Sequence, residues 1–354
     1  MTNPKNRRIK RLLTAIIADL LVLGALLGGF TYFYFLRERD YSPKALESPT
    51  PAAASTASEA TKAPASADPT QQAQATPEPE SISTDTGLLG GKYTEKFNTG
   101  EVEQTENTYK SANVSIEVST VTAGTESKPI TYYVADIYIK DINSFRTAVA
   151  LDYKDQNQGS RKNVMSTLQL SQLTNAIVAI SGDSFAFHDG IVVRNGVEWE
   201  NKLPLYGDIC VLYYDGTMET YSQKIKRADV DAIYAKKPYQ IWTFGPQLLI
   251  DGQMPTSFAN TKANPLCAIG YYEPGHYCFI LVDGRQKDYS WGMTYAELSK
   301  VFFDLGCKVA FNLDGGDTAV MTYLGEWRNQ PEESSPRETS DILYIIEPAA
   351  SSGQ

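Results

Sequence analysis

The stretch of residues 309–321, VAFNLDGGDTAVM, constrains the fold most, because an apolar run stops abruptly there at an acid and two glycines. The run before Asp314 is typical of a buried strand. Gly315 and Gly316 permit a turn with positive φ, and consecutive amides in such a turn can bind an anion. Alone, the pattern also fits a tight turn in which Asp314 only accepts hydrogen bonds from nearby amides. The stretch therefore predicts a strand end that is either a simple turn or part of a site.

A second strand end lies upstream at Asp283, where an apolar run again stops at an acid and a glycine. Between the two acids, residues 294–305 are expected to form a helix, with Thr294 and Glu297 as a capping box. A strand–helix–strand unit usually makes its strands parallel neighbours. We therefore expect both acids at one sheet edge, where sites in α/β layers tend to lie. Paired carboxylates at such an edge favour a catalytic function.

Asp183 marks a third strand end of the same kind, since the apolar run 176–180 stops at a serine and a glycine. By itself this acid fits a turn equally well. The two histidines, His188 and His276, show no metal-binding spacing and are both expected at the surface. The sequence therefore adds a third candidate acid but no metal-binding motif.

The chain beyond residue 90 is rich in segments of β-branched and aromatic residues, which predict strands over 114–122, 130–139 and 146–151. Asn195-Gly196 and Asp215-Gly216 are hairpin turn signals. Residues 91–354 are enough for one sizeable core. We expect a strand-rich, mixed α+β single domain with few helices.

The N-terminus predicts a membrane anchor. Five basic residues precede an apolar run over 12–36, which is long enough to cross a hydrocarbon core of about 30 Å. The basic flank favours a cytoplasmic N-terminus and a domain outside the membrane. A cleaved signal peptide is the alternative, but the run exceeds a typical signal core and no clear cleavage site follows it. We therefore expect residues 1–40 to form a cytoplasmic flank and a single transmembrane signal anchor at the cell membrane.

Residues 41–90 are rich in proline, alanine, serine and threonine, which predicts a disordered linker between the anchor and the domain of residues 91–354. The formal charge of the whole chain is −10, and basic residues are concentrated in the first 40 positions. The outer part is therefore acidic. An acidic domain lacks the positive charge that binds the phosphates of nucleic acid, so nucleic acid is not an expected partner.

Short motifs follow one another in a fixed order between residues 110 and 346. They cover residues 179–185, 193–196, 244–248, 264–270, 283–286, 292–294 and 312–316. Together they resemble the phosphodiester glycosidase family, whose members remove N-acetylglucosamine from a phosphodiester. The chain departs from the family pattern at Ser181, at Leu266-Cys267 and at Asp317.

Together with the predicted anchor and linker, the resemblance implies a membrane-tethered hydrolase that cleaves a sugar-1-phosphodiester of the N-acetylglucosamine type in surface glycans. The leaving phosphate monoester needs less proton donation than an ordinary glycoside, so one carboxylate can do most of the work. This scheme assigns Asp314 as the leading carboxylate and Asp283 and Asp183 as base or positioning acids. The substrate-binding candidates are Arg285, Arg194, Asn312, Gly315, Gly316, Thr318 and Gly245.

Two alternatives stay open at this point. Three converging acids could bind a divalent cation such as Ca²⁺ or Mg²⁺, which prefer oxygen ligands, and no other cofactor is expected. A non-catalytic cell-wall glycan-binding module would also fit the anchor, the linker and the 22 tyrosines. Loss of Asp314 would separate the two functions, because an enzyme would lose turnover whereas a binding module would keep most of its affinity.

Overall fold

The computed structural model describes residues 92–150, 164–332 and 334–348, together with positions 24, 44–45 and 89. Apart from these isolated positions, the predicted anchor and the predicted linker lie outside the described residues. Within the described part of the chain, no helix has the length and apolar character needed to cross a membrane.

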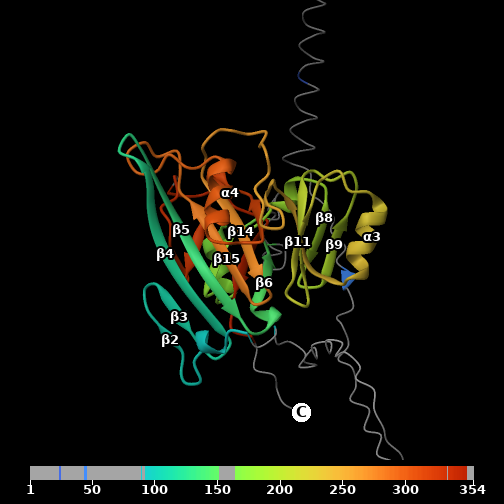
Figure 1. Ribbon diagram of the computed structural model, residues 1–354, viewed down its shortest axis with the longest axis horizontal. Helices are drawn as coiled ribbons and strands as arrows, with labels where there is room; N and C mark the ends of the chain where they lie inside the picture. The colour runs from blue at the N-terminus through green and yellow to red at the C-terminus, as the bar shows by residue number, and fades with distance from the viewer. Residues whose placement is uncertain are drawn as a thin grey trace, which may run out of the picture.

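Three antiparallel sheets make up most of the described chain (Figure 1). The largest has eight strands, which are, in spatial order, β13 (Gln247–Leu249), β16 (Val309–Leu313), β14 (Leu266–Glu273), β15 (His276–Val282), β5 (Lys128–Ile139), β4 (Val114–Thr125), β3 (Thr108–Lys110) and β2 (Glu103–Gln104). The five-stranded sheet has the order β18 (Glu326–Trp327), β17 (Met321–Tyr323), β7 (Val178–Ser181), β19 (Asp341–Ile345) and β6 (Phe145–Val149).

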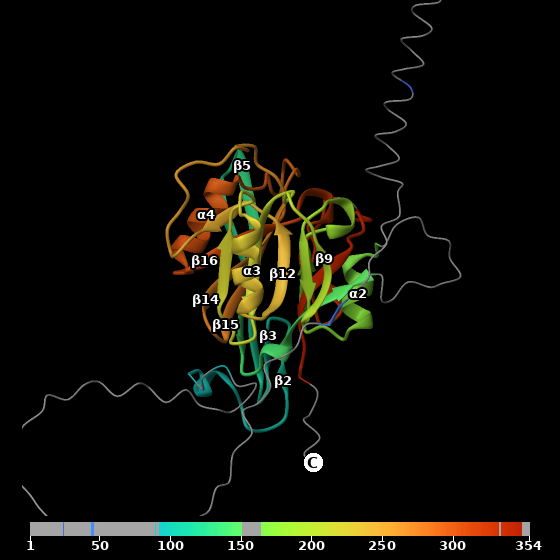
Figure 2. The same ribbon diagram turned by 90° about the vertical axis from the view of Figure 1, so that its right-hand side faces the viewer.

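The six-stranded sheet lies beside the other two and has the order β1 (Lys44–Ala45), β9 (Val197–Asn201), β8 (Ile191–Arg194), β12 (Pro238–Phe244), β10 (Asp208–Tyr213) and β11 (Met218–Tyr221). Helix α3 (Arg227–Ala235) covers its outer face in Figures 1 and 2, where Val230 and Ile233 pack on the strands. Helix α2 (Thr167–Leu173) lies against the five-stranded sheet. The expected strand-rich α+β class is confirmed, while α3 falls in a segment for which no helix was predicted.

Helix α4 (Tyr295–Asp304) forms as its sequence predicts. The Thr294 hydroxyl accepts from the Glu297 amide at 3.2 Å, and the Glu297 carboxylate accepts from the Thr294 amide at 2.8 Å. These two bonds satisfy donors that would otherwise be left open at the helix start. Phe302 packs over Gly270 of β14, where an added Cβ would lie 2.7 Å from the phenylalanine ring. The helix is thus held close to the large sheet.

The predicted strand–helix–strand unit runs through β15, α4 and β16, but its two strands are not neighbours. β14 lies between them and pairs antiparallel with both. The physical reason is the hairpin between β14 and β15, which leaves one edge of β14 free for β16. Both strands still end at the same edge of the sheet, two strand spacings or roughly 10 Å apart. Asp283 and Asp314 are therefore separated by the start of β14.

The core extends slightly upstream of the predicted domain start at residue 91. Leu89 is 9% exposed and packs in the main hydrophobic cluster, and its amide donates to the Lys140 carbonyl at 2.7 Å. Two residues of the predicted linker, Lys44–Ala45, also pair with β9. A fragment that keeps this packing has to begin before Leu89.

Candidate active site

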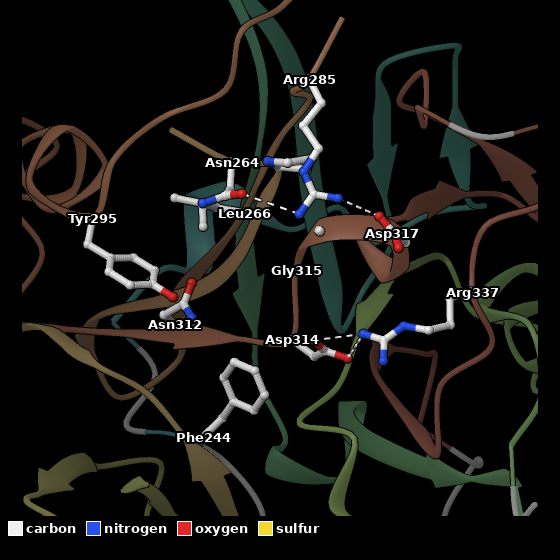
Figure 3. A pocket seen from close by; sticks show the side chains of 12 residues that line it. Phe244, Asn264, Leu266, Arg285, Tyr295, Asn312, Asp314, Gly315, Asp317 and Arg337 are labelled. Atoms are coloured by element: carbon white, nitrogen blue, oxygen red, sulfur yellow. Dashed lines mark hydrogen bonds and ion pairs between the residues drawn. The ribbon is translucent and has the colours of Figure 1, made fainter. Parts of the chain in front are cut away.

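An open pocket of about 240 Å³ lies where β16 ends (Figure 3). Five of the predicted site residues line it, namely Arg285, Asn312, Asp314, Gly315 and Gly316. Its other lining residues are Phe244, Asn264, Pro265, Leu266, Tyr295, Asp317 and Arg337. The strand end at Asp314 and the turn after it therefore form one side of the pocket.

Asp314 is held at the pocket by groups from two different segments, the turn of residues 182–184 and the chain at Arg337. Its amide donates to the Gly182 carbonyl at 3.0 Å. The Ser184 hydroxyl donates to Oδ2 at 2.5 Å, and Arg337 Nη2 donates to the same oxygen at 3.0 Å. The residue is only 7% exposed, so its carboxylate has one fixed direction, which Figure 3 shows together with Arg337.

Burial raises the pKa of the Asp314 carboxyl above its ordinary value. The charge of Arg337 and the hydroxyls of Ser184 and Thr318 oppose this rise without cancelling it. A carboxylate of strengthened basicity, held rigidly at a pocket, can accept a proton or stabilise a developing positive charge. Asp314 therefore has the geometry and the electrostatics of a catalytic acid–base group.

The turn after Asp314 needs both of its glycines. An added Cβ at Gly315 would lie 2.7 Å from the Pro265 carbonyl oxygen, and Gly316 has a φ of +61°. The Gly316 amide donates to the same Pro265 carbonyl at 2.9 Å. This amide is therefore occupied within the protein, so the anion-binding nest predicted for the turn does not include it.

Arg285 lies over this turn, above Gly316. Its Nη1 bonds to Asp317 Oδ1 at 2.5 Å, and its Nη2 donates to Asn264 Oδ1 at 3.3 Å. The side chain is 40% exposed, so the guanidinium remains accessible from the pocket. Figure 3 shows Arg285 and Arg337 approaching the turn from different segments. The pocket thus holds two cations close to one catalytic candidate.

Asn312 supplies a polar group on the remaining wall, beside Tyr295 (Figure 3). Its Nδ2 donates to the Gly245 carbonyl at 2.8 Å, which fixes the amide. Its Oδ1 is buried and has no hydrogen-bond partner among the described residues. A buried acceptor without a partner costs free energy, on the order of 1–3 kcal/mol, which a ligand donor could recover.

Asp283 ends β15 but does not line the pocket. Its carboxylate accepts from Asn329 Nδ2 at 2.7 Å, from the Gln330 amide at 3.0 Å and from the Tyr289 hydroxyl at 2.9 Å. Burial raises its pKa, and these hydrogen bonds oppose that rise. All of these partners belong to loops that pack against the strand end. Asp283 therefore anchors loops, and the expected pairing with Asp314 does not occur.

Asp183 and Arg194 lie beneath the pocket in a cluster with Asp341, which we call the acid–arginine cluster. Arg194 Nη2 contacts Asp183 at 2.7 Å and Asp341 at 3.0 Å, and all three side chains are at most 1% exposed. Burial raises the pKa of Asp341, and the charge of Asp183 adds to this effect. Arg194 therefore does not reach the pocket as the predicted substrate contact. Asp183 likewise does not reach it.

Thr318 and Gly245 also lie outside the pocket lining. The Thr318 hydroxyl donates to the Gly315 carbonyl at 2.8 Å and supports the turn from behind. An added Cβ at Gly245 would lie 3.0 Å from the Asp208 Cβ, so this glycine makes room for a strand neighbour instead of a ligand. Phe244, one residue earlier, is the member of this motif that lines the pocket.

The three predicted acids do not converge, which removes the basis for the divalent-cation alternative. Within the described residues, no three His, Cys, Asp or Glu side chains are placed to hold a metal ion. His188 is 6% exposed, so its predicted surface position is wrong. Of the three predicted acids, the structure instead places only Asp314 at the pocket, together with Arg285 and Arg337.

Sequence reasoning missed Arg337, which approaches Asp314 from the chain between β18 and β19. It lies in a polar stretch without periodicity, and no local pattern links it to Asp314. Ser184 could have been found, because it follows Asp183 within one of the recognised motifs. Its φ of 54° places its hydroxyl at Asp314.

The chain is similar to several known proteins. The family model described as "Phosphodiester glycosidase" matches residues 174–346. A curated relative, the SPbeta prophage-derived uncharacterized protein YomE of Bacillus subtilis, is 26% identical over 280 residues, which are 73% of this chain and 43% of the relative. The chain thus spans less than half of that relative's length.

Two solved structures are also similar. The catalytic domain of zebrafish N-acetylglucosamine-1-phosphodiester alpha-N-acetylglucosaminidase, auto-inhibited by its pro-peptide, superposes with a TM-score of 0.54 at 17% identity, covering 70% of this chain and 88% of that one. A hypothetical protein from Synechocystis gives a TM-score of 0.46 at 12% identity, with 70% and 64% covered. The first of these likenesses shows that the fold is shared.

Proposed function

Because residues 174–346 form a domain of the phosphodiester glycosidase family, we propose that the chain hydrolyses a sugar-1-phosphodiester in the Asp314 pocket. The sugar is of the N-acetylglucosamine type. One observation carries the proposal: a buried carboxylate of raised pKa faces an open pocket that two arginines also line. Of the three predicted acids, only Asp314 has this position.

The reaction adds the oxygen of water to the anomeric carbon and breaks the bond from that carbon to the phosphate oxygen. The products are the free sugar and a phosphate monoester, and the second proton of the water is released. The transition state resembles an oxocarbenium ion, so positive charge develops on the sugar ring. Asp314, negatively charged and fixed by Ser184 and Arg337, stabilises that charge without having to reorganise.

The phosphate of the substrate binds at Arg285, while Arg337 remains the ion-pair partner of Asp314. Arg285 and Arg337 bring two positive charges to the lining, and Asp314 and Asp317 bring two negative charges. A phosphodiester adds one negative charge and can take over the exposed side of Arg285, which its contact with Asp317 leaves accessible. Binding of the leaving phosphate by a guanidinium then favours departure of the monoester.

The sugar occupies the side of the pocket lined by Asn312 and Tyr295. The unpartnered Oδ1 of Asn312 accepts a hydrogen bond from a sugar hydroxyl or from the N–H of an acetamido group. A site that offers a buried acceptor discriminates against a ligand without a matching donor. Asn312 is therefore the proposed specificity residue for the sugar.

The decisive experiment incubates the full-length chain with the methyl phosphodiester of N-acetylglucosamine-1-phosphate and measures released reducing sugar and methyl phosphate. The methyl glycoside of N-acetylglucosamine, which lacks the phosphate, is the matched control and should remain intact. Binding of the phosphodiester without release of sugar would contradict the enzyme and favour a glycan-binding module.

We further propose that the domain lies outside the cell, tethered by the N-terminal segment, where its substrates are surface glycans. The basic flank and the apolar run over residues 12–36 support this location. External protease should then digest the domain in intact cells. Protection of the domain until the cells are lysed would contradict the proposed location.

A further inference from the structure

Two of the four cysteines, Cys278 and Cys307, have their thiols in contact beside helix α4. Their Sγ atoms lie 3.8 Å apart, although the two residues are 29 positions apart in the chain. Cys278 belongs to β15 and is fully buried, whereas Cys307 follows α4 and is 3% exposed. We call these two residues the thiol pair. The fold thus brings together two groups that one oxidation step could join.

The end of α4 explains why Cys307 turns back onto the sheet. Gly306 has a φ of +82°, and its amide donates to the Phe303 carbonyl at 3.0 Å. The Cys307 amide donates to the Phe302 carbonyl at 3.1 Å. These two bonds form a Schellman motif, in which the residue after the left-handed glycine packs against the helix. The cap of α4 therefore directs the Cys307 side chain into the core.

Gly270 makes the matching space on the sheet. It is the register partner of Cys278 across β14 and β15, and an added Cβ at Gly270 would lie 2.7 Å from Cys278 Sγ. A side chain at this position would displace that sulfur atom. Gly270 and Gly306 thus both act to position the thiol pair.

Two other functions of paired thiols fit the thiol pair poorly. A bound metal ion would need further ligands, and the part of the chain that the structure describes supplies no third His, Cys, Asp or Glu beside the pair. Burial raises the pKa of the Cys278 thiol well above its ordinary value, so this thiol is not a nucleophile in the closed structure. A disulfide and a pair of inert core thiols are the two alternatives left.

We propose that Cys278 and Cys307 are a modification site, at which the two thiols are oxidised to a disulfide. Each thiol gives up its hydrogen and one Sγ–Sγ bond forms, while the oxidant, a small-molecule or protein disulfide, takes up two electrons and two protons and becomes two thiols. In the cell this step rests on the location proposed above, because disulfides persist outside the cytoplasm. The chemistry itself can be tested on the purified chain.

The last turn of α4 gives the oxidant its access. Phe303 is 47% exposed and Leu305 is 41% exposed, so this turn has little buried surface to lose when it opens. Opening frees Cys307 and admits water to Cys278, which removes the burial that raises the Cys278 pKa. Cys307 can then exchange with the oxidant, and Cys278 attacks the mixed disulfide and releases the second thiol.

The disulfide would close a covalent ring over residues 278–307. This ring contains Arg285 and Tyr295, which both line the Asp314 pocket. A disulfide stabilises a fold mainly by restricting the unfolded chain, and more so for a longer loop. Oxidation therefore ties the segment that carries one wall of the pocket to the large sheet.

The test equilibrates the full-length chain with glutathione disulfide, blocks the remaining thiols with iodoacetamide under denaturing conditions and maps the peptides by mass spectrometry. We expect Cys278 and Cys307 to be joined to each other. Cys210 and Cys267, whose thiols contact no other cysteine within the described residues, should be alkylated. Alkylation of all four cysteines, a disulfide that includes Cys210 or Cys267, or glutathione retained on Cys307 would overturn the proposal.

A second measurement compares the melting temperatures of the oxidised chain and of the chain reduced with dithiothreitol. The oxidised wild type should melt about 5–10 °C higher than the reduced form. Cys307→Ala should abolish this difference, whereas Cys210→Ala, at a cysteine that is also buried, is the matched control and should retain it. Each variant is compared with itself, so the packing lost through the substitution cancels.

A difference that persists in Cys307→Ala, or that is absent from the wild type, would contradict the disulfide. Neither readout needs a substrate. Failure of the proposed hydrolysis would therefore leave both results unchanged.

Discussion

The Asp314 pocket and the acid–arginine cluster look alike in the sequence and differ in the fold. Each begins where an apolar strand meets an acid beside a glycine, and each pairs that acid with an arginine. The Arg194 side chain is 1% exposed and is shared by two buried acids, whereas the Arg337 side chain is 50% exposed and binds one acid at a pocket. The burial of the arginine, more than the motif around the acid, therefore distinguishes a structural cluster from a candidate site.

The pocket and the acid–arginine cluster are also joined by hydrogen bonds through one short segment, residues 182–184. Gly182 and Ser184, the residues on either side of Asp183, both bond to Asp314. An added Cβ at Gly182 would lie 2.2 Å from Asp341 Oδ1, so the strand end sits directly on the cluster. The acid–arginine cluster therefore supports the strand end that carries the hydrogen-bond partners of Asp314.

The largest expected effect comes from removing the charge of Arg194 from the acid–arginine cluster. Arg194→Met should lower the free energy of unfolding by about 3–5 kcal/mol, because it leaves the carboxylates of Asp183 and Asp341 buried without their cation. Chemical denaturation measures this change. Arg227→Met, at an exposed arginine that bonds to Asn201, is the matched control and should cost less than about 1 kcal/mol. Similar losses of unfolding free energy in both variants would show that the acid–arginine cluster does not stabilise the fold more than an exposed arginine does.

The next largest effect is expected from removing the charge of Arg285 at the pocket. Arg285→Met should reduce kcat/KM for the methyl phosphodiester roughly 10- to 100-fold, since a hydrogen bond to a charged group contributes about 1.5–3 kcal/mol. Its melting temperature should stay near that of the wild type, because the ion pair with Asp317 is exposed. A lowered melting temperature with unchanged kcat/KM would show that Arg285 stabilises the fold and does not bind the substrate.

Much of the fold could be predicted from the sequence, because local patterns determine most of the strands. The capping box of α4 and the strands around Asp314 and Asp283 form as predicted. The insertion of β14 between β15 and β16 could not be predicted, because strand pairing across a sheet depends on which edge remains free. Local sequence contains no information about that choice.

The site was predictable only in part, for a related reason. Asp314, Asp283 and Asp183 share one local pattern, and only the tertiary contacts decide that Asp283 binds Asn329 and Asp183 binds Arg194. Arg337 comes from a segment without regular structure, so nothing in its neighbourhood indicated its position at the pocket. The burial of an acid and the identity of its hydrogen-bond partners depend on the tertiary structure, so a local motif cannot predict them.

The smallest expected effect concerns the pKa of Asp314. Burial raises the pKa of Asp314 and Arg337 opposes that rise, so Arg337→Met should raise this pKa further. Turnover needs the carboxylate form and falls as the pH drops through the pKa. The acidic limb of the pH–rate profile should therefore move to higher pH, while the rate on its plateau changes by less than about fivefold, as expected for a half-exposed ion pair.

Arg337→Lys keeps the positive charge and is the control for this shift. Its acidic limb should remain close to that of the wild type. A limb that moved to lower pH in Arg337→Met, or stayed in place, would mean that Asp314 is not the group whose ionisation controls the rate.

The central claim is that Asp314 is the catalytic carboxylate, and one measurement tests it most directly: turnover of the methyl phosphodiester per folded molecule in Asp314→Asn, with the melting temperature taken on the same preparation. We predict at least a hundredfold loss of turnover, or about 2.7 kcal/mol. The melting temperature at neutral pH should be unchanged or higher, because a carboxyl whose pKa is raised on folding costs stability when charged. Retention of more than about a tenth of wild-type turnover, together with a lowered melting temperature, would contradict the claim and make Asp314 a turn residue.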